Sequence, residues 1–130
     1  MLKGTWAVGG WYTTTVAGCA ILPLVEADPV VAQLPFGGWM TIESDGTATG
    51  ELVDSLGMAA VTGQMTDDVL TFHKTYATGR CAGRPDTHYR LNYCCDPHVI
   101  TYAGAYKCSA DQPTDDGNAR LNFLPGLLLT

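Results

Sequence analysis

Basic side chains are scarce in this chain and unevenly placed. Seven Lys and Arg stand against 13 Asp and Glu in 130 residues, which gives a formal net charge of −6. Lys3 is the only base before Lys74, so the first half of the chain is markedly acidic. An excess of negative charge opposes the approach of a phosphate backbone or an anionic membrane surface. We therefore expect neither nucleic acid nor a membrane as a partner.

Long apolar runs are also missing. No stretch approaches the roughly 18 consecutive apolar residues that a membrane-spanning helix needs. The opening residues Met1 to Trp6 lack the charged and then apolar layout of a signal peptide. As written, the chain is expected in the cytoplasm, and a secreted or periplasmic location applies if a leader has been removed.

Charge is low throughout, at 15% of residues, whereas 46% are apolar, and the chain contains 15 Gly and 7 Pro. This composition is too apolar for a disordered chain and too poor in charge for a coiled coil. The length of 130 residues matches one ordinary domain. We expect residues 1–130 to form a single domain.

Short segments separated by turn residues dominate what is present. Gly, Asp-Gly and Thr/Ser-rich breaks recur at intervals that suit strands and are too short for helices, and Ser44 to Gly46 is a hairpin signal. The candidate strands are Thr5–Val8, Trp11–Val16, Gly38–Ser44, Thr47–Val53, Met58–Met65, Val69–Thr75, His88–Cys94, Val99–Lys107 and Ala119–Leu124. Their short connections imply an up-and-down meander, and closure of a meander removes its unpaired edges. We predict an all-β fold, a single closed antiparallel barrel of about eight strands, in preference to a sandwich.

One segment interrupts this rhythm. Ala17–Phe36 carries three prolines, many aliphatic residues and only two charges. The prolines exclude one continuous helix. We interpret the segment as a lid or plug over one barrel mouth, and a self-association surface is the alternative.

Alternation along a strand assigns side chains to two faces. From Val69 to Tyr76, the set Leu70, Phe72, Lys74 and Tyr76 is predicted to face inward, and Val69, Thr71, His73 and Thr75 outward. A lysine inside an apolar barrel is costly unless it is paired or loses its proton. Lys74 is therefore either paired with Asp54 or Glu51, or it contacts a ligand.

Two patterns carry a resemblance. Gly4-Thr5-Trp6 opens a first strand, and further motifs follow at Asp45–Gly50, Asp54–Gly57, Thr62–Gly63, Leu70–Tyr76 and Thr101–Gly104. The first pattern, followed by a meander, resembles the calycin group of lipocalins, avidins and fatty-acid-binding proteins. The second resembles small uncharacterised bacterial barrel domains. The resemblance implies a barrel that holds a small molecule, but the residues that identify lipocalin or biotin sites are not found here.

Aromatic and small residues supply the candidate ligand site. Barrels of about eight strands can enclose one small ligand. Small residues on the strands suggest room for such a cavity: Ala48, Gly50, Ala59, Ala60, Gly63, Ala103, Gly104 and Ala105. The expected ligand-binding residues are Trp6, Trp39, Phe72, Lys74, Tyr76, Tyr89, Tyr93 and Tyr102.

The five cysteines, an odd number, leave at least one thiol unpaired in a monomer. They are Cys19, Cys81, Cys94, Cys95 and Cys108. Free thiols in a reducing compartment are the first interpretation. If a bridge exists, Cys81 to Cys108 is preferred, because Cys95 and Cys108 would lie at opposite ends of one strand.

Other chemistry is poorly represented. Cys94 to His98 lacks the second short-spaced ligand pair of a structural zinc site, so we expect no metal and no cofactor. His73, His88 and His98 fall on predicted outer or turn positions, and no serine stands in a nucleophile elbow.

The sequence thus favours a protein that binds a small apolar or aromatic molecule in the lumen, more readily than an enzyme. One alternative is a cyclase or isomerase in which Lys74 or a tyrosine moves a proton. Another is a filled barrel that self-associates into a homo-oligomer.

Overall fold

The protein is an all-β chain in the computed structural model, which describes residues 2–15, 31–54, 56–79, 82–83, 86–95, 99–108 and 117–128. The strands are β1 (Gly4–Thr15), β2 (Val31–Ile42), β3 (Thr47–Asp54), β4 (Gly57–Thr66), β5 (Val69–Tyr76), β6 (Thr87–Cys94), β7 (Ile100–Cys108) and β8 (Gly117–Leu128). Within these ranges no helix is long and apolar enough to cross a membrane.

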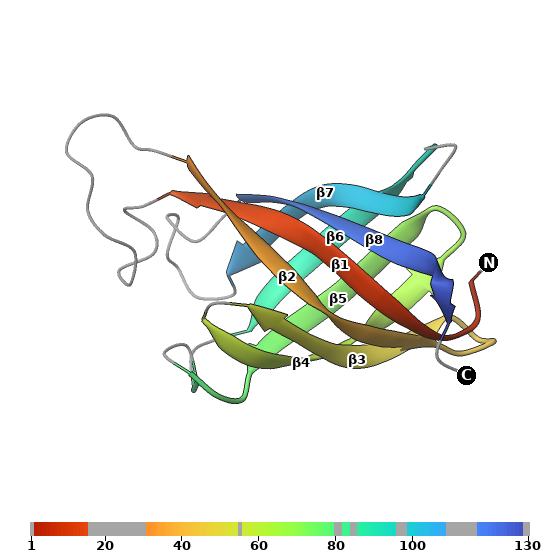
Figure 1. Cartoon of the computed structure of the whole chain (residues 1–130), viewed down its shortest axis with the longest axis horizontal. Coiled ribbons are helices and arrows are strands. Elements are labelled where there is room, and N and C mark those ends of the chain that lie inside the picture. Colours follow the sequence, from red (N-terminus) through yellow and green to blue (C-terminus); the bar gives the residue numbers. More distant parts are fainter. Residues whose placement is uncertain are drawn as a thin grey trace.

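The eight strands form one closed barrel in sequence order (Figure 1). Each strand pairs antiparallel with the next, and β8 closes the barrel on β1 through pairs such as Val8 with Phe123. Closure pairs both edges of the sheet, which removes the unpaired backbone groups that an open meander would expose. The predicted fold class, a closed up-and-down antiparallel barrel, is confirmed.

The two ends of the barrel differ in their connections (Figure 1). At the end where β1 starts, tight turns join β2 to β3 and β4 to β5; we call this the hairpin end. The Asp-Gly turn predicted there is present, with Gly46 at φ +93° and its N–H donating to the Glu43 carbonyl at 3.0 Å. At the opposite end, which we call the loop end, β1, β3, β5 and β7 end, and β2, β4, β6 and β8 begin.

Side chains alternate across the barrel wall as predicted for β5. Leu70, Phe72 and Lys74 are buried and Tyr76 is half-buried, whereas His73 and Thr75 are exposed. The same alternation turns Tyr89 and Leu91 of β6 inward. The inward assignment of Lys74 from periodicity is therefore confirmed.

Three strands are much longer than predicted. Thr5–Val8 and residues 11–15 of the next predicted strand belong to one strand, β1, because Gly9 and Gly10 stay in register with Gly37 and Phe36. β2 begins at Val31, so the last residues of the predicted lid are strand, and Phe36 is buried in the core. β8 spans Gly117–Leu128 and extends the predicted strand at both ends. The remainder of the lid, residues 17–30, lies outside the described residues.

Inward glycines allow the strands to approach closely. A Cβ added at Gly10 would lie 1.8 Å from the Arg120 carbonyl oxygen of β8, and one at Gly63 would lie 2.0 Å from the Thr71 oxygen of β5. Gly50 and Gly104 meet neighbouring strands in the same way. Their predicted role as room for a cavity is wrong, because the space that their missing side chains leave is occupied by backbone. Ala60 and Ala105 face outward and are exposed.

Candidate functional site

The interior of the barrel changes character between its two ends. Toward the hairpin end it is a close-packed apolar core. Its buried members include Met40, Ile42, Ala48, Met65, Leu70, Leu91, Leu121 and Phe123. Toward the loop end the inward residues become aromatic and then charged.

Lys74 and Asp54 form an ion pair inside the loop end. The last inward position of β3 is Asp54, and Lys74 is inward on β5; their atoms Nζ and Oδ2 are 3.1 Å apart. Both side chains are only 2% exposed. Of the two partners considered for Lys74, Asp54 is therefore the one that the fold supplies, whereas Glu51 is exposed on the outer face.

Tyr76 completes a hydrogen-bonded group of three, which we call the polar cluster (Lys74, Asp54 and Tyr76). The Tyr76 hydroxyl donates to the same Asp54 oxygen, Oδ2, at 2.6 Å. Asp54 Oδ1 accepts from the backbone N–H of Leu56 at 2.8 Å, which fixes the carboxylate at the turn into β4. A carboxylate with this many donors is held in one orientation.

Four aromatic rings surround the Lys74 ammonium. The Nζ atom lies 4.7 Å from the ring centre of Tyr12, 4.8 Å from Tyr76, 5.4 Å from Tyr89 and 5.7 Å from Phe36. These four rings, which we call the aromatic cage, come from β1, β5, β6 and β2. A cation within about 6 Å of a ring face is attracted by the ring quadrupole, so the cage stabilises the charge together with Asp54.

Further stacking extends the cage across the barrel. Phe72 stacks on Tyr89 with ring centres 4.6 Å apart and planes 7° apart, and Tyr89 stacks on Tyr106 at 5.2 Å. Tyr106 meets Tyr12 edge-on at 5.9 Å, and its hydroxyl donates to the Thr13 carbonyl. The aromatic layer therefore separates the polar cluster from the aliphatic core.

The environment keeps Tyr76 and Tyr89 protonated. Burial raises the pKa of Tyr76 far above its ordinary value, and the nearby Tyr12 and the hydrogen bond to Asp54 act in the same direction. Burial, together with the charge of Asp54, also raises the pKa of Tyr89. Tyr76 is thus a hydrogen-bond donor at neutral pH.

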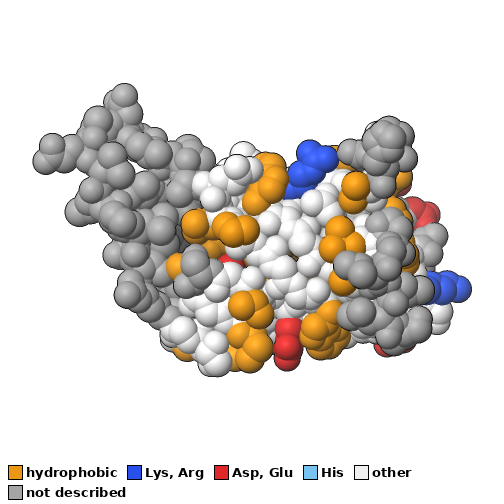
Figure 2. Space-filling view, in the orientation of Figure 1, with side chains coloured by type: hydrophobic (Ala, Val, Ile, Leu, Met, Phe, Trp, Pro, Cys, Tyr) orange, Lys and Arg blue, Asp and Glu red, His pale blue; other side chains and the backbone are white. Residues whose placement is uncertain are grey.

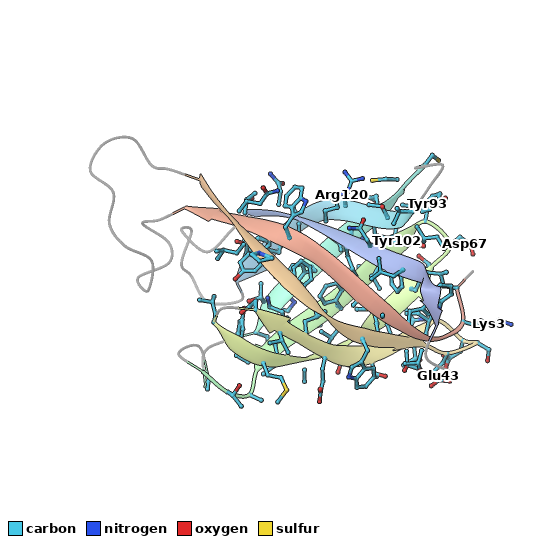
Figure 3. All side chains as sticks on the ribbon, in the orientation of Figure 1. Lys3, Glu43, Asp67, Tyr93, Tyr102 and Arg120 are labelled. Atoms are coloured by element: carbon cyan, nitrogen blue, oxygen red, sulfur yellow. The ribbon has the colours of Figure 1, made fainter. Side chains whose placement is uncertain are left out.

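The predicted ligand-binding residues do not form a single cluster. Phe72, Lys74, Tyr76 and Tyr89 lie together toward the loop end. Tyr93 and Tyr102 lie near Asp67 at the hairpin end (Figure 3), where the Tyr102 hydroxyl donates to the Asp67 carbonyl at 3.3 Å. Burial is the main cause that raises the pKa of Tyr102.

The two predicted tryptophans lie elsewhere. Trp6 packs edge-on against Phe123 at the hairpin end, and its indole N–H donates to the Lys3 carbonyl at 2.9 Å. Trp39 faces outward from β2 and is 36% exposed. Apolar side chains on the face of the molecule that contains β1 and β2 are scattered rather than joined in one patch (Figure 2).

The predicted ligand-binding set lacked three residues of the aromatic layer, Tyr12, Phe36 and Tyr106. Phe36 had been assigned to the lid, and Tyr106 was not singled out. Alternation along β7 could have predicted that Tyr106 faces inward, because Tyr102, Gly104 and Tyr106 share one face of that strand. Phe36 gave no such signal, since Pro35 precedes it.

The cysteines and histidines lie away from the polar cluster. Cys94 and Cys95 are free thiols at the hairpin end, and Cys108 ends β7 at the loop end, which confirms their predicted separation. Cys19, Cys81 and His98 lie outside the described residues. Among the residues that are described, no three His, Cys, Asp or Glu side chains could hold a metal ion.

Fold and site together define a closed eight-stranded antiparallel barrel with an aromatic-caged ion pair inside its loop end. The chain matches no family model, and neither a curated protein nor a solved structure is significantly similar to it.

Proposed function

We propose that the protein binds a small apolar or aromatic molecule at the loop end of the barrel interior, as calycin barrels do. Tyr76 and Lys74 supply the polar contacts, and the aromatic cage supplies the apolar surface. The observation that carries this proposal is the ion pair between Lys74 and Asp54, both 2% exposed, in an otherwise apolar interior.

Stability alone gives little reason for this pair. Removing two charges from water costs several kcal/mol per ion, and well-packed apolar residues of similar volume often serve a fold as well or better. The aliphatic half of the same barrel shows that this chain can fill an interior without charges. A fixed, hydrogen-bonded polar group among apolar and aromatic side chains is instead typical of ligand recognition.

The charge balance of the polar cluster indicates the class of ligand. Asp54 already neutralises Lys74, so a second carboxylate would be repelled by Asp54 at close range. A neutral carbonyl avoids this repulsion and can accept a hydrogen bond. In the complex the Tyr76 hydroxyl, which has one proton, would exchange its bond to Asp54 for one to the ligand carbonyl, while Lys74 stays paired with Asp54. Tyr76, which is half-buried, lies between the buried pair and the outside. We therefore favour an apolar ketone or aldehyde over the corresponding carboxylic acid.

Protein-observed NMR titration tests this proposal with a medium-chain methyl ketone and the fatty acid of matching length. The ketone is expected to shift resonances of Tyr76 and Phe36 with saturation, and to bind more tightly than the acid. Tyr76→Phe should weaken ketone binding about tenfold, since a lost hydrogen bond is worth about 1 kcal/mol or more.

Tyr93→Phe is the matched control, because it removes the same hydroxyl at the hairpin end and should leave binding unchanged. Equal weakening by Tyr76→Phe and Tyr93→Phe would reject the loop end as the site. Failure of apolar ketones, aldehydes and acids alike to bind the unaltered protein would reject the proposal as a whole.

The second candidate function is an enzyme that moves a proton, and the polar cluster is the observation that favours it. Tyr76, Asp54 and Lys74 form one hydrogen-bonded chain, which is the arrangement needed to move a proton to or from a bound carbonyl compound. The raised pKa keeps Tyr76 protonated at neutral pH, so its role would be that of a hydrogen-bond donor to the carbonyl oxygen and not that of a base. Exchange of the ketone α-protons for deuterium in D₂O, catalysed by the protein and lost in Tyr76→Phe, would distinguish an enzyme from a binder.

A further inference from the structure

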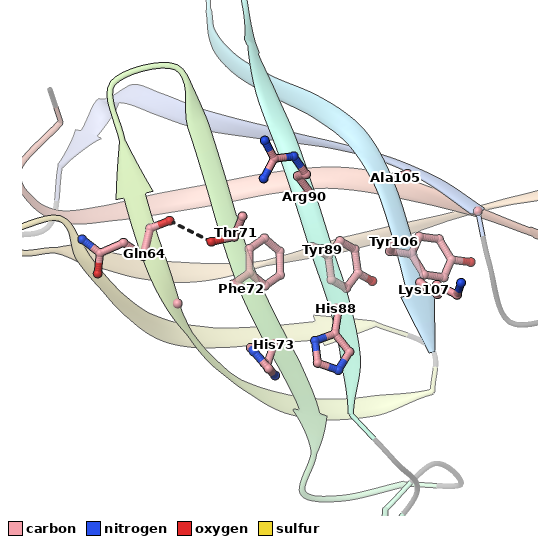
Figure 4. A pocket seen from close by; sticks show the side chains of 12 residues that line it. Gln64, Thr71, Phe72, His73, His88, Tyr89, Arg90, Ala105, Tyr106 and Lys107 are labelled. Atoms are coloured by element: carbon pink, nitrogen blue, oxygen red, sulfur yellow. Dashed lines mark hydrogen bonds between the residues drawn. The ribbon is translucent and has the colours of Figure 1, made fainter. Parts of the chain in front are cut away.

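A trough lies on the outside of the barrel, across β4 to β8, with a volume of about 690 Å³ (Figure 4). Its floor follows a row of paired residues, Phe72, Tyr89 and Tyr106, whose side chains point inward. The residues on either side of that row project outward and form the walls. We call this feature the outer trough.

One wall is a row of nitrogen-bearing side chains. His73 pairs with His88, and His88 pairs with Lys107, so the three project from neighbouring strands on the same face. The two imidazole rings are 4.2 Å apart between centres. Arg90, two residues along β6 from His88, stands on the other wall beside Thr71 (Figure 4).

The charge of the outer trough is opposite to that of the chain. Among the described residues, its lining contains Arg90, Lys107 and two histidines, and no Asp or Glu. The whole sequence has 13 acidic residues against 7 basic ones, so a described lining with two bases and no acid differs from the overall composition. Within the described ranges neither Arg90 nor Lys107 makes an ion pair.

One described carboxylate, Asp86, borders the outer trough. Asp86 Oδ1 accepts a hydrogen bond from the Thr75 hydroxyl at 2.8 Å, and its Oδ2 lies 3.9 Å from His73 Nδ1. Asp86 therefore lies at the His73 end of the row. Arg90 and Lys107 stand on opposite walls of the trough, and neither makes an ion pair with Asp86 (Figure 4).

Strand geometry gives the size of this positive region. Neighbouring strands are about 4.8 Å apart, and residues two apart on one strand are about 7 Å apart. Arg90 and Lys107 are diagonal neighbours on β6 and β7, which places long side chains within reach of one common group. That spacing suits a single tetrahedral oxyanion, with Arg offering paired donors and Lys a point charge.

We propose that the outer trough binds a phosphate monoester, with the phosphate held between Arg90 and Lys107 and with His88 as an additional donor. This site faces outward and is separated by the barrel wall from the polar cluster. It is independent of the function proposed for the interior, and either can fail without the other.

Isothermal titration calorimetry at fixed ionic strength tests the site with phenyl phosphate, inorganic phosphate and phenol as probes. Phenyl phosphate is expected to bind saturably. Arg90→Gln and Lys107→Gln should each weaken binding about tenfold or more, because each removes a charge-assisted hydrogen bond. Binding of inorganic phosphate with similar affinity would identify the phosphate as the recognised group, whereas binding of phenol would overturn the proposal.

Lys3→Gln is the matched control, since it removes one positive charge at the hairpin end. The Lys3→Gln variant should bind phenyl phosphate with the same affinity as the unaltered protein. Equal weakening by Lys3→Gln and Arg90→Gln would show a general charge effect and contradict the site. Normal binding of phenyl phosphate by the double variant, Arg90→Gln with Lys107→Gln, would also contradict the site.

Discussion

Lys74 contributes to this barrel through the groups that surround it. Its ammonium is paired with Asp54 and enclosed by four aromatic rings, so its charge is compensated inside a poorly solvated space. Removing only one member of such a pair leaves an isolated charge. Replacing Lys74 alone should therefore lower the free energy of unfolding more than replacing both members of the pair.

Lys74→Met is expected to lower the free energy of unfolding by about 3 kcal/mol or more, because it leaves the Asp54 carboxylate buried without its cation. Adding Asp54→Asn to that variant should restore part of the loss, since the amide carries no charge. Chemical denaturation of the two variants measures both effects. A double variant less stable than Lys74→Met would contradict the ion-pair account.

Glu51→Gln serves as the control for this experiment. Glu51 was the other candidate partner of Lys74, but it is exposed on the outer face of β3. Its replacement should change stability by no more than about 0.5 kcal/mol, as is usual for surface positions.

The buried tyrosines predict a loss of stability at alkaline pH. An unfolded tyrosine loses its proton near pH 10, whereas burial raises the pKa of Tyr89 in the folded state. Above about pH 10 the unfolded state therefore binds fewer protons than the folded state, and the free energy of unfolding falls with pH. Below that pH the contribution is fully present.

Tyr89→Phe should reduce the alkaline slope by up to about 1.4 kcal/mol per pH unit, the value for one proton. Denaturant unfolding at several pH values between about 9 and 11 measures the slope. Tyr93→Phe, which changes a ring that is 40% exposed, is the comparison. Identical slopes for the two variants would contradict the burial of Tyr89 as the cause.

At the scale of elements, sequence patterns predicted most strands but misjudged β1 and β2. Gly9 and Gly10 looked like a break, yet both continue the ladder to β2. Pro35 also argued against a strand, because proline lacks the N–H that a central strand needs. Pro35 is tolerated because β2 pairs there with β1 only. The pairing of β2 with β3 starts at the next residue, Phe36.

The site was predictable to the extent that it follows from alternation within one strand. That rule placed Lys74 and Tyr76 inside, and the pairing with Asp54 was one of two options for a carboxylate on the preceding strands. The cage could not be predicted in full, because its rings come from β1, β2, β5 and β6. The position of each ring along the barrel axis depends on how the strands are offset from one another in the closed barrel. The residue pattern of a single strand does not give that offset.

Adjacent glycines in β1 provide a test of close strand approach. Gly10→Ala should destabilise the protein by about 2 kcal/mol or more, because its Cβ would lie 1.8 Å from the Arg120 oxygen and backbone must shift. Gly9→Ala, whose nearest atom would be 3.9 Å away, should be neutral or slightly stabilising. Thermal unfolding of the two variants compares them directly. Equal destabilisation would show that the cost lies in lost glycine flexibility and not in the contact.

In the whole molecule, closure of the sheet gives the barrel an inner surface and an outer surface with different chemistry. The inside is apolar at the hairpin end and polar at the loop end, whereas the outside carries a basic trough on an acidic chain. Both surfaces cross the same strands, β5 and β6, with alternate residues serving each. A one-residue change of register would exchange the two sets, so the account depends on the register of these strands.

The central claim is that the loop end of the interior is a ligand site, and intermolecular nuclear Overhauser effects test it most directly. With a bound medium-chain ketone, we expect contacts from the ligand to ring protons of Phe36 and Tyr76. Contacts only to residues of the hairpin end, such as Trp6 and Tyr93, or only to residues of the outer face, would contradict it.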